Sequence, residues 1–211
     1  MQGSIIAVIH SDLGADERAE RLMRVLALSP YDARQHGQAP LPRAICSRAP
    51  AEEAAAAALR LSAEGLASAV FQRDTVLSDA RRFLVRALQV RDEGLAGARK
   101  DGAQATIAWG DVAFIVLGMR NRLAFVDVVD EHGGVFSVRE RETQFEGSGL
   151  PAVGGRAGVL ALAAEVRARS NGRFDDRLMK PATLAQVCGP FAGSPLVDDL
   201  AESILLRSLA T

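Results

Sequence analysis

The chain has few cysteines and few aromatic residues, and each scarcity narrows what it can do. Its two cysteines, Cys46 and Cys188, lie far apart with no Cys-x-x-Cys or Cys/His spacing beside either. The sequence therefore predicts reduced thiols, with neither a disulfide framework nor a zinc site. One tryptophan and one tyrosine are too few for the stacked aromatic surfaces that bind single-stranded nucleic acid.

Net charge and long hydrophobic runs are scarce as well. The 25 basic and 26 acidic side chains give a formal net charge of -1, so no overall field would draw the chain to nucleic acid or to an anionic membrane. No apolar run approaches the ~18 residues needed to cross a bilayer, and no basic stretch precedes an apolar one at the N-terminus. We therefore expect a soluble, cytoplasmic protein. Only Lys100 and Lys180 are lysines, which together with abundant alanine indicates a GC-rich bacterial genome.

What is present is a regular succession of strand and helix patterns. A chain of 211 residues, 48% of them hydrophobic, can bury one large core or two modest ones, and the pattern favours two domains. In the first domain, 1–74, Leu22, Val25 and Leu26 fall on one face at helical spacing, and Gly65 suits a left-handed helix end. The expected elements are a strand at 4–9, helices at 16–26 and 31–38, a strand at 43–47, a helix at 50–65 and a strand at 66–71.

This order resembles the C-terminal domain of the ribosomal stalk protein L7/L12 and the adaptor ClpS, which shares that fold. The sequence stretches that carry the resemblance are Ser29-Pro30-Tyr31-Asp32-Ala33-Arg34, Pro42-Arg43-Ala44-Ile45 and Glu52-Glu53-Ala54 leading to Ala63-Glu64-Gly65-Leu66-Ala67. The resemblance implies a small α/β sandwich. The basic factor-binding surface of the stalk domain and the residues with which ClpS reads an N-terminal amino acid have no counterpart here, so it implies no partner.

Residues 82–211 are predicted to form the second domain. The stretches Asp92-Glu93-Gly94 and Lys100-Asp101-Gly102 are hairpin turns a strand length apart. They favour a strand at 83–91 after a linker or short helical piece near 75–81, although the apolar spacing of 76–91 also fits a helix and the choice stays open. The expected elements are strands at 83–91, 95–99, 104–109, 112–117, 123–129 and from 135 to 145, a helix at 156–169 and a last amphipathic helix from 194.

A meander of this kind closed by one helix looks like a bacterial PH-like (pleckstrin-homology or GRAM-type) barrel. The resemblance covers 82–170 and includes the stretch Trp109-Gly110-Asp111-Val112-Ala113-Phe114-Ile115 at the entry to an inner strand. The predicted fold class is thus α+β, with an L7/L12- or ClpS-like sandwich followed by a PH-like antiparallel β-barrel with C-terminal helices. The apolar stripe of the last helix must be covered by the barrel or by another chain, so a homo-oligomer through this helix stays open.

Glycines mark one candidate ligand site. Gly149 and Gly154 are spaced like the glycines of a phosphate loop, but Gly155-Arg156 follows where lysine and a hydroxyl residue should stand. We interpret 147–155 as a flexible joint. The alternative is that Gly149, Gly154, Gly155 and Arg156 bind a small molecule or an anion at a helix N-terminus.

Histidines and carboxylates give no catalytic or metal site. His10, Asp12 and His36 could converge in the first domain, yet no nucleophile motif such as Gly-x-Ser-x-Gly accompanies them. The acidic residues near Asp127 and Asp175 lack EF-hand spacing. We expect no catalytic residue, no metal and no cofactor.

The sequence therefore favours a non-catalytic adaptor that binds a protein of unknown identity by surface recognition. The predicted partner-binding residues are an exposed aromatic-basic corner, Tyr31, Arg34 and Arg43, and two charges of an edge strand, Arg139 and Arg141. The first alternative is a sensor of small molecules or anions at Gly147–Gly155, and the second is an enzyme of unknown class.

Overall fold

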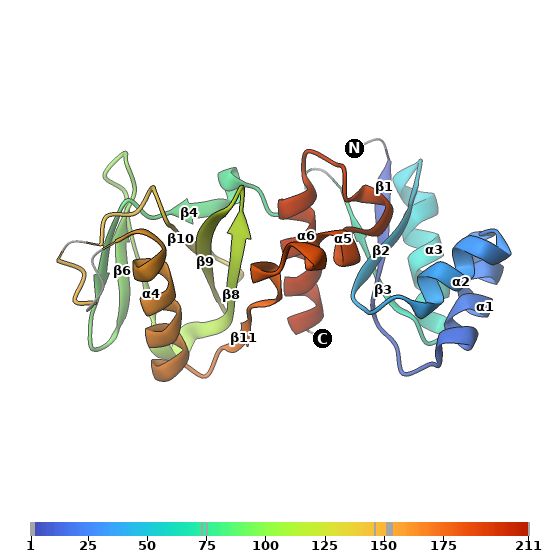
Figure 1. Cartoon of the computed structure of the whole chain (residues 1–211), viewed down its shortest axis with the longest axis horizontal. Coiled ribbons are helices and arrows are strands. Elements are labelled where there is room, and N and C mark those ends of the chain that lie inside the picture. The colour runs from blue at the N-terminus through green and yellow to red at the C-terminus, as the bar shows by residue number, and fades with distance from the viewer. Residues whose placement is uncertain (1–2, 73, 75, 146, 151–153, 211) are drawn as a thin grey trace. The chain divides into compact units, whose positions relative to one another are not determined.

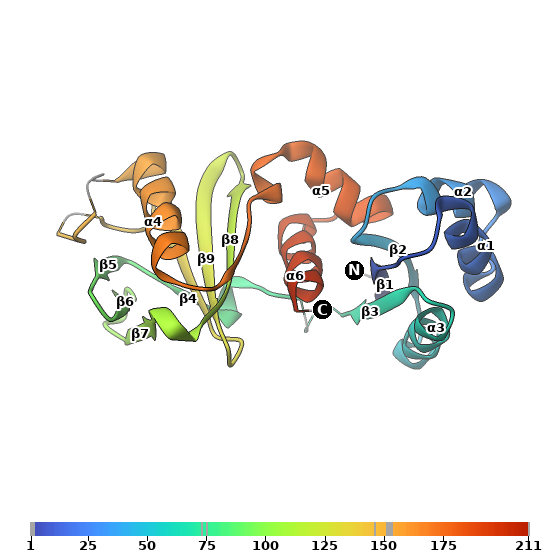
Figure 2. The same cartoon turned by 90° about the horizontal axis from the view of Figure 1, so that it is seen from below.

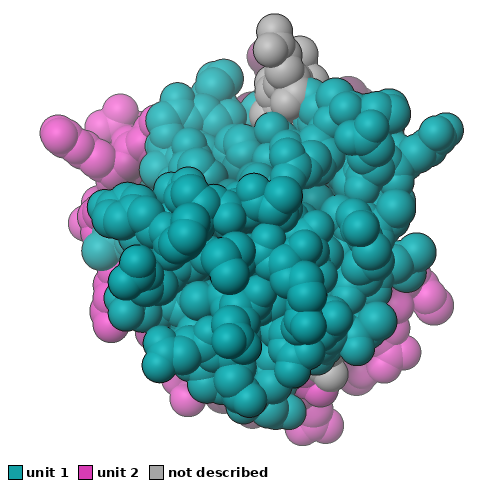
Figure 3. Space-filling view, turned by 90° about the vertical axis from the view of Figure 1, so that its right-hand side faces the viewer, with its two compact units in different colours: residues 1–77, 182–211 teal, residues 78–181 magenta. Residues whose placement is uncertain are grey.

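The structure is a computed structural model that describes residues 3–72, 74, 76–145, 147–150 and 154–210. The chain divides into two compact units, residues 1–77 with 182–211 and residues 78–181 (Figure 3). Each unit combines helices with a sheet, so the fold class is α+β. The sequence assigned the terminal helices to the second domain, 82–211, whereas residues 182–211 group with the first unit.

The first unit is built on a three-stranded antiparallel sheet in the order β2-β1-β3. Its helices lie on both faces of this sheet, with α1, α2 and α3 on one face and α5 and α6 on the other (Figures 1 and 2). The elements are β1 (Ser4–His10), α1 (Ala15–Leu26), α2 (Pro30–Gln38), β2 (Arg43–Arg48), α3 (Ala51–Ala63), β3 (Ala67–Phe71), α5 (Pro181–Cys188) and α6 (Val197–Leu209).

The core under α1 and α3 follows from the predicted helix faces. Leu22 and Leu26 of α1 and Leu61 of α3 are buried against Ile6 and Val8 of β1. Burial of such side chains contributes about 1.5–3 kcal/mol each. Helix α3 ends where the sequence predicted, because Gly65 takes a φ of +83° and lets the chain turn directly into β3.

Helix α6 covers the opposite face of the same sheet. Its apolar stripe, Leu200, Ile204 and Leu205, is fully buried, and α6 packs on β1. The chain itself therefore covers the stripe that the sequence left unassigned. A homo-oligomer through α6 stays an untested prediction. The apolar stripe that would have formed its interface is buried within the chain.

The second unit contains two sheets, and no closed barrel is formed by the residues that the structure describes. A five-stranded sheet has the order β11-β8-β9-β10-β4, and a three-stranded sheet has the order β5-β6-β7. The prediction of a closed PH-like barrel is therefore wrong. The sheet is not purely antiparallel either, because β4 pairs in parallel with β10 and β11 pairs in parallel with β8. The elements are β4 (Arg82–Leu84), β5 (Ala87–Val90), β6 (Gly94–Ala98), β7 (Gln104–Ala108), β8 (Val112–Arg120), β9 (Leu123–Asp130), β10 (Val135–Arg139), α4 (Gly155–Arg169) and β11 (Arg173–Asp175).

The predicted strand 83–91 is in fact two strands in different sheets. The amide of Val85 still donates to Ser137 of β10 (2.9 Å), whereas the amide of Arg86 donates to Ala98 of β6 (2.7 Å). The chain therefore passes from one sheet to the other between these two residues. Apolar alternation reports burial but not which neighbour a strand pairs with, so the sequence could not show this break.

Helix α4 packs on β8 and β9 through Val159, Leu162, Ala163 and Val166, all of them buried. Leu160 is 40% exposed, because it lies one residue off the i, i+3, i+4, i+7 stripe that begins at Val159.

The two thiols are predicted to react slowly with alkylating reagents. Both cysteines are free, and burial raises the pKa of Cys188 to about 12 from an ordinary value of 9.0. A shift of that size lowers the thiolate fraction near neutral pH about a thousandfold, and the thiolate is the nucleophile. Iodoacetamide labelling followed by mass spectrometry should therefore leave Cys188 unmodified in the native protein and label it in urea. Rapid labelling of native Cys188 would contradict its burial.

Candidate functional site

A groove runs along the outer edge of β3 in the first unit. It consists of two neighbouring hollows of about 520 and 290 Å³, which share Ser62, Ser68 and Arg207. Pockets of this size hold small ligands or short peptide segments. We call this depression the β3 groove; it is lined by Ala55, Ala58, Leu59 and Ser62 of α3, residues 67–71 of β3, Arg207 of α6, residues 9–12 and Gly65.

One wall of the β3 groove is apolar and exposed. Leu59 of α3 is 73% exposed, a larger fraction than for Tyr31, Met23 or Leu160. The small side chains of Ala55 and Ala58 leave space beside it. A large exposed apolar side chain next to a hollow is typical of an interaction surface, whereas a scattered exposed leucine needs no explanation. The hollow is what distinguishes Leu59 from the isolated Leu160.

The two edges of the three-stranded sheet differ in how they are protected. The edge strand β2 carries Arg43 and Arg48 at its ends, and its pairing with β1 is irregular. The chain after α5 also covers it, since Gly189 lies so close that a Cβ there would be 2.6 Å from the Ala44 carbonyl oxygen. Strand β3 contains no charged residue and no proline, two of the features that natural edge strands use against unwanted pairing. Among the described residues, no strand pairs with its outer edge.

The predicted aromatic-basic corner is only partly available. Tyr31 is 66% exposed on α2, and its hydroxyl accepts a hydrogen bond from Gln35 (2.7 Å). Arg34 is exposed and donates to the Pro30 carbonyl (3.2 Å). Arg43 instead donates to the Gln186 carbonyl at the end of α5 (2.6 Å), so it holds the terminal segment on β2. Whether this corner binds a partner stays a prediction.

Variants of these three residues should differ in stability, because only Arg43 holds another segment in place. Arg43→Ala should destabilise the protein by about 1–3 kcal/mol, because it leaves a carbonyl at the end of α5 without its charged donor. Tyr31→Ala and Arg34→Ala should change stability by less than about 0.5 kcal/mol, as expected for exposed positions. Urea denaturation of the three variants measures this. Equal losses would contradict the structural role of Arg43.

The predicted edge-strand charges belong to an ion-pair network in the second unit. Strand β10 is not an edge strand, because β9 and β4 flank it. Arg139 donates to both carboxylate oxygens of Asp79, which also pairs with Arg120 (3.2 Å) and Arg82 (3.4 Å). Arg141 is exposed and lies in the turn after β10. The arrangement gives Arg139 a structural role, and partner binding by either arginine stays untested.

This network makes part of the stability depend on pH. Hydrogen bonds from Arg139, with the charges of Arg120 and Arg82, hold the pKa of Asp79 below its ordinary value of 3.8. The unfolded chain therefore takes up a proton at Asp79 at a higher pH than the folded chain does. Its contribution is present above the ordinary value and is lost as pH falls from about 3.8 through the lowered folded pKa. In urea titrations, the Asp79→Asn variant should lose less unfolding free energy than the wild type between about pH 4 and about pH 3. An equal loss in the two proteins would contradict the contribution of Asp79.

The glycine loop does not gather the groups expected of an anion site. Gly149 and Gly154 have positive φ values of +85° and +118°, and residues 151–153 lie outside the described residues. Arg156 turns to Glu140 (3.4 Å) and to the Arg122 carbonyl (2.9 Å), which occupy its guanidinium. Among the described residues, the loop thus brings no uncommitted cation to the start of α4, which begins at Gly155.

Among the residues that the structure describes, one histidine-carboxylate pair lies at the end of the β3 groove. His10 Nε2 lies 3.1 Å from Asp12 Oδ1, but both side chains are mostly exposed. The nearby serines are committed to the backbone, since Ser68 Oγ donates to Leu66 (2.7 Å) and Ser11 Oγ donates to Gly65 (2.9 Å). His36 contacts Arg43 instead, and burial followed by the Arg43 charge lowers its pKa. The described part of the chain therefore lacks an activated nucleophile beside this pair.

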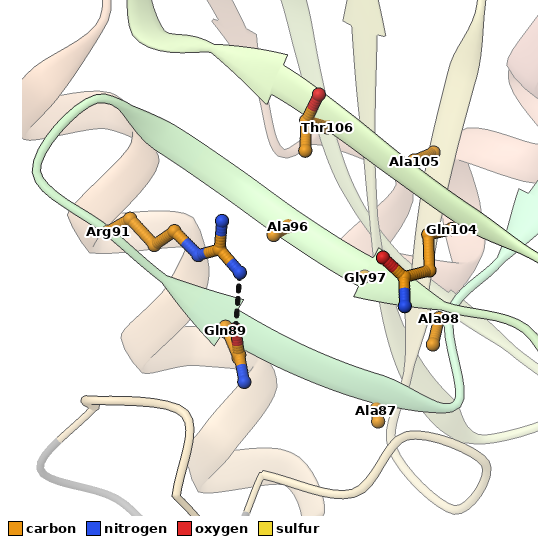
Figure 4. A pocket seen from close by; sticks show the side chains of 9 residues that line it. All are labelled: Ala87, Gln89, Arg91, Ala96, Gly97, Ala98, Gln104, Ala105 and Thr106. Atoms are coloured by element: carbon orange, nitrogen blue, oxygen red, sulfur yellow. Dashed lines mark hydrogen bonds between the residues drawn. The ribbon is translucent and has the colours of Figure 1, made fainter.

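Another hollow, of about 240 Å³, lies on the outer face of the β5-β6-β7 sheet in the second unit (Figure 4). Its floor is made of the small residues Ala96, Gly97 and Ala98, and Gln89 accepts a hydrogen bond from Arg91 at one side (2.7 Å). Gln104 and Thr106 lie on the opposite side. This hollow has no histidine, carboxylate or large apolar side chain in its lining, so it offers neither catalysis nor an apolar anchor.

Two other kinds of site are absent from the part of the chain that the structure describes. No three histidine, cysteine, aspartate or glutamate side chains there gather closely enough to hold a metal ion. Asp130, for example, caps its own turn by accepting from the amides of His132 and Gly134 (both 2.8 Å). In the same residues, no helix combines the length and apolarity that crossing a membrane requires.

Comparisons with models of protein families, with curated proteins and with solved structures find no match for this chain. The candidate site therefore depends on the geometry alone. Sequence reasoning did not single out Leu59 or β3. One signal was available, because Leu59 and Leu61 are two positions apart on α3 and cannot both face the core.

Proposed function

We propose that the protein is a non-catalytic adaptor that binds a protein partner in the β3 groove. The observation that carries the proposal is the exposed Leu59 beside a hollow and an unprotected sheet edge in one unit. Interfaces bury apolar anchors in such pockets, and a few central residues supply most of the binding energy. A cytoplasmic location stays a prediction.

The proposed fold of the first unit agrees with an adaptor role. We infer an L7/L12- or ClpS-like sandwich, supported by the order β1-α1-α2-β2-α3-β3, which includes every element on which the resemblance depends. Fold alone assigns no partner. The β3 groove is therefore argued from this chain's own residues, among them the alanines and the leucine of α3, and not from the fold.

Photocrosslinking tests the proposed function. A photoreactive amino acid in place of Leu59 should crosslink a specific protein in cells, whereas the same residue in place of Met23, which is 39% exposed on α1, should not. The crosslinked protein, once purified, should bind the wild type directly and bind Leu59→Asp about 10–100-fold more weakly, because a charge would be buried at the anchor. Met23→Asp serves as the matched control. Crosslinking equally from both positions, or binding unaffected by Leu59→Asp, would contradict the proposal.

The sensor alternative has a separate test. A ligand at about a hundred times its dissociation constant stabilises a protein by about 2.7 kcal/mol, which raises the melting temperature measurably. A thermal-shift screen with nucleotides and phosphorylated metabolites, repeated with Arg156→Ala, would detect binding at Gly147–Gly155. We expect no shift, because Arg156 is committed to Glu140 and Arg122.

A further inference from the structure

We infer that the occupant of the β3 groove is an extended peptide segment of the partner, which adds to the first unit's sheet as a strand beside β3. This inference rests on the proposed function, since it names what the proposed site binds. Three features carry it: the direction of the β3 backbone groups, the chemistry of the α3 wall, and the length of the open edge.

The backbone of β3 presents hydrogen-bonding groups to the groove. The amide of Ser68 donates to Ser62 Oγ (3.2 Å), on the side away from β1. Successive residues of an antiparallel strand point their backbone groups alternately to the two sides. The regular register from Ser68 to Phe71 against β1 therefore places the N–H and C=O of Val70 on the open edge as well. An added strand would pair with the N–H and C=O of Val70, since the Ser68 amide already has a partner in Ser62.

The α3 wall of the groove predicts what the added segment carries. Successive side chains of a strand point to opposite faces of the sheet. One set would meet Leu59 and Ala55 on the α3 face, and the other would lie on the α6 face. Apolar side chains suit the α3 wall. We expect a segment with an apolar side chain at every second position.

The open edge also fixes the length of the segment. Strand β3 has five residues, which at about 3.3 Å per residue span about 17 Å. A segment of similar length fills the edge. Recognition by strand addition draws affinity from main-chain hydrogen bonds and specificity from alternate side chains, in agreement with the two preceding features.

A display experiment on the full chain tests the inference. Random linear peptides displayed on phage are selected on the wild-type protein with the Leu59→Asp variant as a negative selection. Enriched peptides should carry an apolar residue at every second position. For the tightest binder, each amide is then methylated in turn; methylation at every second position should weaken binding about fivefold or more, because each lost hydrogen bond lowers the affinity, and methylation at the other positions should have little effect.

Protein variants give the complementary readout. Val70→Pro removes the donor that faces the groove and should weaken peptide binding about tenfold or more, with the fold retained because proline is tolerated at an edge strand. Val70→Thr keeps the N–H and a β-branched shape, so it should bind as the wild type does. If Val70→Pro fails to fold, the effect of peptide methylation on binding to the wild type still tests strand addition.

The outcomes separate the two proposals. A selected peptide that is sensitive to Leu59→Asp but lacks the alternating methylation pattern would overturn strand addition and leave the proposed function intact. Failure to enrich any peptide sensitive to Leu59→Asp would count against strand addition, while the crosslinking experiment still decides the proposed function. Light scattering that shows a dimer dissociated by Val70→Pro would overturn the inference by making a second copy of the chain the occupant.

Discussion

Replacing Asp127 by alanine is expected to destabilise the second unit by about 3–5 kcal/mol, because breaking a buried ion pair by removing one of its members is strongly destabilising. The Asp127 carboxylate accepts from Arg82 Nε (2.8 Å) and from Ser137 Oγ (2.6 Å), and all three side chains are almost completely buried. Asp79 also pairs with Arg82, at 3.4 Å, but its side chain is about half exposed. Screening by water makes it a weaker counter-charge.

Urea unfolding followed by the fluorescence of Trp109 measures this loss, because the only tryptophan lies in the second unit. Glu131→Ala is the control; this exposed carboxylate is in the turn after β9, and its loss should cost less than about 0.5 kcal/mol. The double variant Arg82→Met with Asp127→Leu should recover most of the stability, because apolar pairs often replace buried ion pairs without loss. Equal effects of Asp127→Ala and Glu131→Ala would contradict the buried pair.

Replacing Leu200 by alanine is expected to destabilise the first unit by about 2–5 kcal/mol, because it leaves a cavity at a fully buried position of α6. Leu200 is fully buried, and α6 packs on β1. Leu206→Ala, at a half-buried position of the same helix, should cost clearly less. The contrast tests whether the terminal helices belong to the first unit.

Hydrogen exchange with mass spectrometry locates the effect of Leu200→Ala. Peptides from β1 and β3 should lose protection first, and peptides from β8 and β9 should keep theirs, since regions that unfold together exchange together. Loss of protection in β8 and β9 instead would return the terminal helices to the second domain, as the sequence predicted.

Local patterns in the sequence predicted the first unit well, up to β3. The Leu22, Val25 and Leu26 stripe, the Ser29-Pro30 cap and Gly65 each determine structure within a few residues, and such signals are readable from a single chain. The packing of α6 on β1 is a contact between residues nearly two hundred positions apart. An apolar stripe indicates that another segment covers it but not which segment does so.

The second unit shows the limit of strand patterns. The turns at 92–94 and 100–102 correctly separate β5, β6 and β7. The passage of the chain between sheets at Val85 and Arg86 and the parallel pairing of β4 depend on distant partners, so the predicted closed barrel was wrong. Gly97 illustrates the same point, because a Cβ there would be 2.5 Å from Phe136 Cζ, a constraint that only the packed core imposes.

The candidate site was hidden from the sequence for a related reason. Charged and aromatic residues such as Arg43 and Arg139 attract attention as binding residues, yet both make structural contacts here. The β3 groove depends on the absence of charge along a short strand and on one leucine turned away from the core. Neither is visible until the edge of the sheet is known.

Amide hydrogen exchange of Val70, measured by NMR with and without the selected peptide, tests the central claim most directly. Because strand addition would convert the open Val70 N–H into a ladder hydrogen bond, its exchange should slow about tenfold or more when the peptide is saturating. Unchanged exchange at Val70 in a complex that still depends on Leu59 would show that the groove binds its partner in another way.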